Sequence, residues 1–152
     1  MLGDSLLVAP VFSAEGTVSF YVPEGTWTHL LSGATVVGPR WVEEHHGFDS
    51  MPLLVRPGTV LPVGARTDRP DVDWADGVTL RLFELADGHR SEVVIPSSED
   101  GSLVAARFTV ERSGGSVEVR RVESQRRSAW AVEVAGACVE ASDEDDVLTV
   151  RL

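Results

Sequence analysis

Two adjacent histidines among acidic residues are the first place where this sequence could do chemistry. His45 and His46 follow Glu43 and Glu44 and precede Asp49, so nitrogen and oxygen ligands for a metal ion lie close together. Successive residues of a strand point to opposite faces, which keeps the two imidazoles from binding one ion. No further histidine or cysteine follows nearby at zinc spacing. We therefore interpret the group as the polar end of a strand and predict no metal site.

The acidic run Asp143-Glu144-Asp145-Asp146 is the second candidate, because calcium prefers oxygen ligands of this kind. The run lacks the interleaved glycine and the spaced ligands of a calcium-binding loop. A solvated turn is the simpler interpretation, and we expect neither a metal nor a cofactor there.

Paired carboxylates are the third candidate, because glycoside hydrolysis needs two of them converging on one bond. Asp68, Asp71, Asp73 and Asp76 lie in the polar, irregular stretch of residues 66–77. Catalytic carboxylates need a rigid strand end and a partly desolvated site that separates their pKa values. A flexible-looking connection beside no evident pocket offers neither, so we interpret these aspartates as solvated loop residues.

Ser13 and Cys138 are the nucleophile candidates. Neither lies in a local motif such as the Gly-x-Ser-x-Gly elbow. Cys138 lies in a predicted strand of small residues, where a buried and inert thiol is expected. The sequence thus predicts no catalytic, cofactor-binding or metal-binding residue in this chain.

Four tryptophans could form a platform on which sugar rings stack. Trp27, Trp41 and Trp130 lie in alternating strands, where a core position is expected. Trp74 lies in the polar connection and is either a surface anchor or a plug between layers. A stand-alone carbohydrate-binding β-sandwich, which needs at least two exposed and coplanar aromatic rings, is therefore kept as an alternative function.

Length and charge restrict the classes to which the chain can belong. Its 152 residues suffice for one ordinary domain or two small ones, and 43% of them are hydrophobic. No apolar run suggests a membrane span, and no basic flank suggests a secretory signal. The net charge of −11 argues against nucleic-acid binding. A single cysteine excludes an internal disulfide framework and favours a reducing, cytoplasmic location.

Short strand patterns separated by turn signals fill the chain, and no segment has a sustained helical period with caps. The expected strands cover residues 6–12, 17–22, 26–31, 35–37, 40–45, 53–55, 59–61, 78–85, 89–95, 103–111, 116–122, 129–134 and 147–152. Turns are expected at Pro23-Glu24-Gly25, and hairpin loops at Ala86-Asp87-Gly88 and Ser113-Gly114-Gly115. Pro57-Gly58 predicts a type II turn that makes a corner between sheets.

These patterns predict an all-β fold with two small antiparallel β-sandwiches, separated by the polar connection at residues 66–77. Residues 6–12 are apolar without alternation, which predicts a strand buried on both faces. Such a strand needs a layer on each side. In the isolated chain we expect it either to favour association with other copies or to leave the first dozen residues disordered.

The stretch M-L-G-D-S-L-L-V-A-P-V-F at residues 1–12 resembles the end of the catalytic barrel in glycoside hydrolase family 31. The stretch Y-V-P-E-G-T-W that follows is similar to the Pro-x-Gly-x-Trp signature of that family. Residues 48–64, F-D-S-M-P-L-L-V-R-P-G-T-V-L-P-V-G, resemble its next landmark. R-P-D-V-D-W-A-D-G and L-F-E-L-A-D-G-H resemble the α-xylosidase branch more than the general α-glucosidases.

The resemblance implies a remnant of the last TIM-barrel strand at residues 1–12, a proximal C-terminal β-domain at 13–77 and a distal β-sandwich at 78–152. It implies a parent α-xylosidase, a retaining glycosidase that hydrolyses O-glycosyl bonds with two aspartates on its barrel. No position in this chain matches the motif around either aspartate, so the chain is expected to be inactive alone. The expected partners are the missing barrel of the same enzyme and further copies of the chain, with neither nucleic acid nor membrane.

Overall fold

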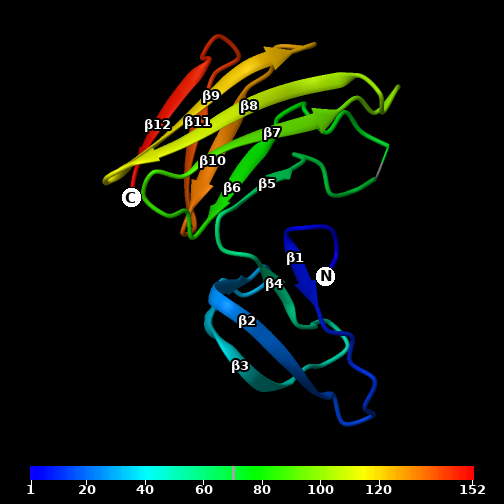
Figure 1. Ribbon diagram of the computed structural model, residues 1–152. Helices are drawn as coiled ribbons and strands as arrows, with labels where there is room; N and C mark the ends of the chain where they lie inside the picture. The colour runs from blue at the N-terminus through cyan, green and yellow to red at the C-terminus, as the bar shows by residue number, and fades with distance from the viewer. Residues whose placement is uncertain (70) are drawn as a thin grey trace. The chain divides into compact units, whose positions relative to one another are not determined.

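The computed structural model describes residues 1–69 and 71–152, and every regular element within these ranges is a strand (Figure 1). This confirms the predicted all-β class. In chain order the strands are β1 Leu6–Val8, β2 Thr17–His29, β3 Thr35–His45, β4 Leu53–Val55, β5 Thr59–Val63, β6 Thr79–Phe83, β7 Arg90–Pro96, β8 Val104–Ser113, β9 Ser116–Ser124, β10 Trp130–Val134, β11 Ala137–Ala141 and β12 Val147–Arg151. Residues 1–69 and 71–152 contain no helix with the length and apolar character needed to cross a membrane.

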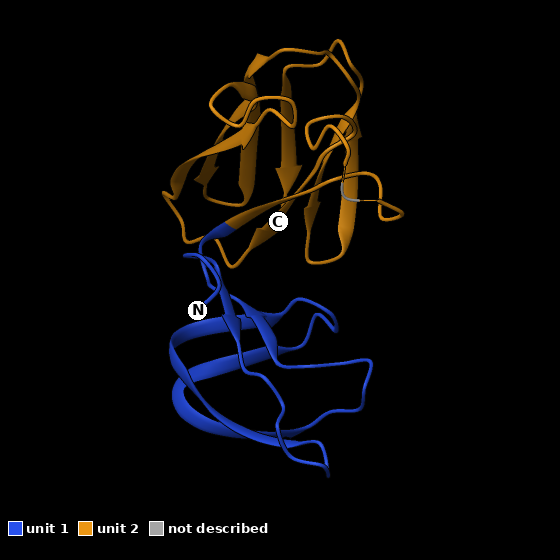
Figure 2. Ribbon diagram, turned by 90° about the vertical axis from the view of Figure 1, so that its right-hand side faces the viewer, with its two compact units in different colours: residues 1–59 blue, residues 60–152 orange. Residues whose placement is uncertain are grey.

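The chain divides into two compact units, Met1–Thr59 and Val60–Leu152 (Figure 2). We expected the polar connection at residues 66–77 to separate two domains, but it lies inside the second unit. The reason is that β5 pairs with β6 in a sheet of that unit, so the chain joins the second unit before the connection begins.

Unit 1 contains one sheet with the strand order β1-β4-β2-β3, rather than the expected pair of sheets. Its edge strand β1 runs antiparallel to β4, with Leu7 opposite Leu54. The segment that we expected to be a separate barrel remnant is therefore shorter than predicted and belongs to this sheet. Leu7 and Ala9 are buried, whereas the side chain of Phe12 is 91% exposed, so burial on both faces does not extend through residues 6–12.

Strands β2 and β3 are each continuous where the sequence predicted two shorter strands. The pairing shifts register between Val22 and Gly25, which lie opposite Arg40 and Gly38. Pro23 and Glu24 together therefore lie opposite the single residue Pro39, which makes a bulge with one extra residue and not a turn. A bulge accommodates a proline without a ladder hydrogen bond and bends the strand, while pairing resumes beyond it.

Three close contacts fix this bend in β2. A Cβ atom on Gly38 would lie 1.9 Å from the carbonyl oxygen of Pro23, so only glycine permits this approach of the two backbones. Gly25, with a φ of 115°, lies so close to the ring of Pro57 that a Cβ would come within 2.8 Å of its Cγ. The indole Nε1–H of Trp27 donates a hydrogen bond to the same Pro23 carbonyl at 3.0 Å.

The core of unit 1 collects residues from all of its strands. Its buried members are Leu7, Ala9, Phe20, Val22, Trp27, Val36 and Leu54. Phe20 and Val22 precede the bulge and Trp27 follows it, so the bend brings both halves of β2 onto one core. Because the sheet has no second sheet to cover it among the described residues, the bent strand itself closes the core.

The type II turn predicted between β4 and β5 is confirmed. Gly58 has a φ of 82°, as the third position of this turn requires, and the N–H of Thr59 donates to the carbonyl of Arg56 at 3.3 Å. The two strands belong to different sheets, so the prediction of a corner is also confirmed.

Unit 2 is a β-sandwich, as predicted, with the strand orders β11-β10-β6-β5 and β12-β9-β8-β7 in its two sheets. Its core contains residues from both sheets, among them Leu80, Leu82, Val93, Ile95, Phe108, Val110, Val117, Val119, Trp130, Val132, Leu148 and Val150. The rings of Phe108 and Trp130 lie 5.2 Å apart across this core. The pairing of β6 with β10 is parallel, which the sequence did not predict.

Two turns of unit 2 differ from the prediction and one agrees. The loop at residues 86–88 connects the two sheets, because Glu84 adopts a positive φ of 44° and redirects the chain before Leu85 is buried. The hairpin between β8 and β9 is confirmed. The hairpin between β10 and β11 was missed. Its turn uses Ala135 and Gly136, both at positive φ, without the usual Asn-Gly or Asp-Gly signal.

We expect Gly38→Ala to destabilise unit 1 by about 2–3 kcal/mol, because the new methyl group meets backbone that can move only if β2 and β3 separate. Native-state hydrogen exchange of amides in β2 and β3 would measure the loss. Gly101→Ala is the control, since a Cβ there meets no atom within 4 Å and should change stability by less than about 0.5 kcal/mol. Equal exchange rates in the two variants would contradict this account of the bend.

Candidate functional site

His46, the residue that follows β3, belongs to a polar cluster that the sequence showed only in part. The Glu44 carboxylate contacts two imidazoles: its Oε1 lies 2.9 Å from Nε2 of His29, and its Oε2 accepts a hydrogen bond from Nε2 of His46 at 2.8 Å. The other ring nitrogen of His46 lies 3.0 Å from the hydroxyl of Ser50. His29 stands fifteen positions before Glu44 in the sequence, and only the bend of β2 brings them together, so no local spacing could have revealed it.

This cluster has the geometry of a structural clamp. Each Nε2 atom faces its own carboxylate oxygen, so the two imidazoles do not converge on a shared ion position. In residues 1–69 and 71–152 no group of three or more His, Cys, Asp or Glu side chains is arranged to hold a metal ion. The cluster is largely buried and joins the end of β2, β3 and the loop that follows β3.

The acidic run at residues 143–146 wraps around the guanidinium of Arg121, whose side chain is only 4% exposed. Its Nη2 donates to the carbonyl oxygens of Asp143 at 2.6 Å and Asp145 at 2.9 Å. Its Nη1 donates to the carbonyl of Ser128 at 2.8 Å, and its Nε lies 3.3 Å from a carboxylate oxygen of Asp146. The carbonyl oxygens that a calcium loop would turn toward an ion therefore accept hydrogen bonds from an arginine of the same chain.

The loop around Arg121 has further internal partners, and Asp143, Glu144 and Asp145 are exposed, as expected of a solvated turn. Trp130 lies under the guanidinium, with 5.9 Å from the arginine Cζ to the ring, and its Nε1–H donates to the Asp145 carbonyl at 2.9 Å. Arg127 forms two hydrogen bonds with the Asp146 carboxylate, at 3.0 and 2.8 Å. These contacts make the loop a fixed part of unit 2.

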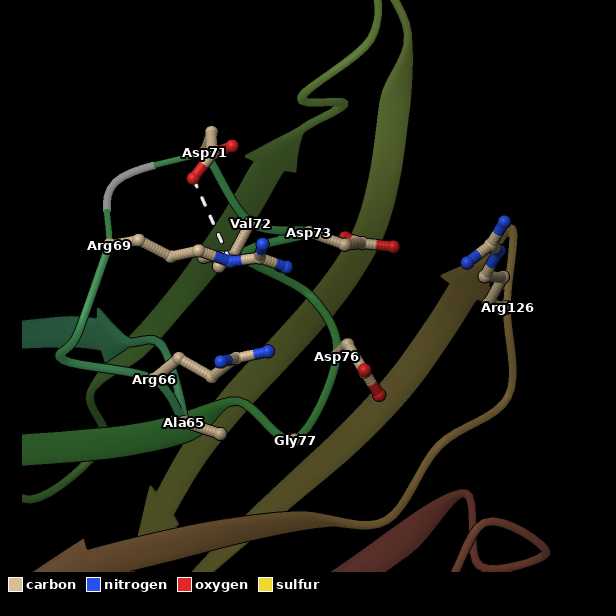
Figure 3. A pocket seen from close by; sticks show the side chains of 9 residues that line it. All are labelled: Ala65, Arg66, Arg69, Asp71, Val72, Asp73, Asp76, Gly77 and Arg126. Atoms are coloured by element: carbon tan, nitrogen blue, oxygen red, sulfur yellow. Dashed lines mark ion pairs between the residues drawn. The ribbon is translucent and has the colours of Figure 1, made fainter.

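The irregular stretch at residues 66–77 does border a pocket, contrary to our expectation. The cavity has a volume of about 320 Å³, and its lining residues are Ala65, Arg66, Arg69, Asp71, Val72, Asp73, Asp76, Gly77 and Arg126. Figure 3 shows Arg66 and Arg69 reaching in from one side, Arg126 from the other, and Asp73 and Asp76 between them. The sequence could not show this, because Arg126 comes from the loop after β9, far along the chain.

Asp68 lies beside this pocket and does not line it. Its carboxylate accepts two hydrogen bonds from Arg66, at 3.0 and 2.7 Å, which hold the pKa of Asp68 below its ordinary value. A carboxylate stabilised in its charged form is poorly suited to act as a general acid. The prediction that this aspartate has no catalytic role remains consistent with its surroundings.

The two nucleophile candidates lie outside this pocket. The hydroxyl of Ser13 donates to the backbone carbonyl of Thr17 at 2.8 Å, which closes a local turn. Cys138 is exposed, so the prediction of a buried thiol is wrong. The reason is that Cys138 belongs to β11, an edge strand of its sheet in which only the last residue, Ala141, is buried.

The tryptophans divide into core and surface residues. Trp27 and Trp130 are buried as predicted, whereas Trp41 is 70% exposed and the prediction of a core position for it is wrong. Trp41 contacts Tyr21 on the neighbouring strand, with ring centroids 5.8 Å apart and planes inclined by 63°. Trp74 is 44% exposed. The alternative function, a carbohydrate-binding module, requires at least two exposed and coplanar aromatic rings. The rings of Tyr21 and Trp41 are inclined to each other and do not form such a platform.

Family models match both units of the chain. Residues 73–152 match the model described as the C-terminal domain of the α-xylosidase YicI, and residues 1–61 match the C-terminal domain of glycosyl hydrolase family 31. The chain belongs to glycosyl hydrolase family 31. Both matches concern C-terminal domains, so the catalytic barrel of the family is absent from this chain.

This family 31 chain is similar in sequence to two α-xylosidases. It is 37% identical to an α-xylosidase of Emericella nidulans over 128 residues and 30% identical to the α-xylosidase XylQ of Lactiplantibacillus pentosus over 125 residues. These matches cover 78% and 80% of this chain, but only 16% of each relative. A third relative, an isomaltosyltransferase of Sporosarcina globispora, is 38% identical over 64 residues, or 41% of this chain and 6% of that protein.

Solved family 31 structures share the fold. A family 31 α-xylosidase of Xanthomonas citri superposes with a TM-score of 0.73 at 19% identity, covering all of this chain and 19% of that one. A Flavobacterium johnsoniae dextranase gives a TM-score of 0.68 at 18% identity, covering 88% of this chain and 18% of that one. The same β-fold therefore occurs in a dextranase and in an α-xylosidase, and fold alone does not indicate the substrate.

We expect Arg121→Met to destabilise unit 2 by about 3–5 kcal/mol, because it leaves buried carbonyl oxygens without donors while preserving most of the side-chain volume. Urea unfolding followed by the signals of β9 and β12 would measure the change. The neighbouring Arg120→Met is the matched control, since Arg120 makes an exposed pair with Glu118 that is worth no more than about 1 kcal/mol. Similar losses in both variants would contradict a special role for Arg121.

We also expect acid to destabilise the loop at residues 142–146. Hydrogen bonds from Ser142 lower the pKa of Asp145, and hydrogen bonds from Arg127 and Arg121 lower that of Asp146. The unfolded chain then binds protons more readily, so the stabilisation is complete above the ordinary value of 3.8 and is lost as the pH falls through the lower folded pKa values. Thermal unfolding between pH 5 and roughly pH 2 would show the decline, and Asp146→Asn should flatten it. A pH-independent melting temperature over this range would refute the prediction.

Proposed function

We propose that the chain forms the non-catalytic C-terminal part of an α-xylosidase, in which both units support a catalytic barrel that hydrolyses α-linked xylosides. The observation that carries this proposal is the match of residues 73–152 to an α-xylosidase C-terminal domain. Identity of 37% with the Emericella nidulans α-xylosidase, which extends over most of the chain, supports it. The distal unit is the more informative part, because its family model is described by an α-xylosidase, whereas the model that matches residues 1–61 is described by the family alone.

The surface of unit 1 supports the idea of a missing partner. Phe12 and Phe48 are almost fully exposed, and both lie in loops joined by a hydrogen bond from the N–H of His46 to the carbonyl of Gly16 at 2.9 Å. Trp41 adds a third large exposed ring on the sheet. Side chains of this kind are unfavourable in water and are typical of surfaces that contact another domain. The barrel of the parent enzyme is the partner that we propose.

The cellular location of the protein and the self-association of the isolated chain are two further proposals. An exposed free thiol at Cys138 is compatible with a reducing compartment, which supports a cytoplasmic location. Association of the isolated chain with itself would be a consequence of the exposed aromatic residues, and it stays a prediction.

We expect the purified chain to leave p-nitrophenyl α-xyloside intact, because the two barrel carboxylates that this chemistry needs have no counterpart in it. Release of p-nitrophenol would be followed by absorbance, with the full-length Emericella nidulans α-xylosidase as positive control. Hydrolysis by the chain alone would overturn the non-catalytic role.

The genomic sequence upstream of this chain provides the second half of that test. We expect it to encode a family 31 barrel, either in frame or after a frameshift. A neighbourhood without any such sequence would leave the proposed support function without its partner.

A further inference from the structure

The pocket beside residues 65–77 has features of a binding site that the role as a support for a barrel does not require. Its cavity of about 320 Å³ lies within unit 2 and is lined by three arginines and three aspartates from two separate loops. This volume is at the lower end of the range for small-ligand sites. Figure 3 shows that the charged ends of Arg66, Asp76 and Arg126 point toward the open space.

The floor of the pocket is held in place by backbone contacts. The N–H of Ala75 donates to Oδ1 of Asp73 at 3.0 Å, and the N–H of Asp76 donates to the Asp73 carbonyl at 3.1 Å. The N–H of Gly77 donates to the hydroxyl of Ser128 at 3.3 Å, which connects the two loops that line the cavity. Val72 is buried beneath them. These hydrogen bonds fix the backbone that carries Asp73 and Asp76.

Several polar groups around the cavity keep hydrogen-bonding capacity. Arg66 is engaged with Asp68, and Arg69 pairs with Asp71 only at 3.7 Å. Within the described part of the chain, neither the guanidinium of Arg126 nor the carboxylate of Asp76 has an ion-pair partner. The pocket thus presents a set of strong donors opposite a set of strong acceptors.

The balance of charge indicates the class of ligand. An anion attracted by the arginines would also face Asp71, Asp73 and Asp76, and a cation attracted by the aspartates would face three guanidinium groups. A hydroxyl group is neutral, donates one hydrogen bond and accepts up to two, so it fits between a carboxylate and a guanidinium. Adjacent hydroxyl groups on one rigid ring can satisfy both sides of the pocket at once.

We propose that this pocket of unit 2 binds a small, neutral, polyhydroxylated ring compound, a sugar, between Arg126 on one loop and Asp76 and Arg66 on the other. Binding at this site does not depend on the proposed function, because all residues that line the pocket lie in unit 2. Its ligand would be held by hydrogen bonds between the charged side chains and the ring hydroxyls.

Titration of the full 152-residue chain with D-xylose and D-glucose, followed by backbone amide NMR, tests the site. We expect saturable shifts confined to amides of residues 65–69, 71–77 and 124–128, with half-saturation on the order of millimolar for at least one sugar. Sodium phosphate and spermidine serve as the anionic and cationic probes, and neither should produce the same saturable pattern. Saturable shifts with phosphate or spermidine and none with either sugar would overturn the assignment of the ligand class.

Substitutions distinguish specific binding of a sugar in this pocket from weak, non-specific association of sugar with the protein surface. Arg126→Gln and Asp76→Asn should each weaken binding of the sugar about tenfold, since each removes a charged hydrogen-bonding partner without filling the cavity. Arg90→Gln is the matched control, because Arg90 is exposed on β7 in the same unit and does not line the pocket. Unchanged affinity in both pocket variants, or an absence of saturable shifts with both sugars, would refute the proposal whatever the activity of the parent enzyme.

Discussion

The bend of β2 at its bulge is the constraint on which unit 1 depends. A lone sheet must bury one face, and here the sheet closes its core by folding one strand around it. Gly38 permits the close approach of the two backbones, and Gly25 leaves room for the ring of Pro57. The Trp27 indole fixes the bulge by donating a hydrogen bond to the Pro23 carbonyl. The cluster of Glu44 with two imidazoles then joins segments that the bend has brought together.

In unit 2 a second sheet buries the apolar face that a lone sheet would expose. One end of this sandwich also needs donors for backbone carbonyls. Two sheets bury their inner faces against each other, but the loop before β12 has backbone carbonyls that turn inward. Arg121 supplies the donors, and Trp130 lies against its guanidinium. A buried arginine is tolerated because nearly every donor finds an acceptor, which avoids the cost of an unpaired charge.

The polar clusters of the chain are of two kinds, which differ in whether their side chains already have hydrogen-bonding partners within the chain. The histidine cluster and the Arg121 loop have partners within the chain, so they stabilise structure and leave little capacity for a ligand. The pocket at residues 65–77 retains such capacity in Arg126 and Asp76. Large exposed rings on unit 1 are available for the proposed contact with a barrel, and the chain spans 16% of the length of each α-xylosidase relative.

The sequence by itself determined the all-β class, the type II corner at Pro57-Gly58, the hairpin between β8 and β9 and the family, because these follow from local turn chemistry and contiguous motifs. Only the tertiary structure decided that Pro23-Glu24-Gly25 is a bulge, since a proline and a glycine also make turns. It likewise exposed Trp41 and Cys138, which alternation could not assign to a face. It also joined His29 to Glu44 and Arg126 to the pocket, because contacts between distant residues depend on strand curvature and sheet order.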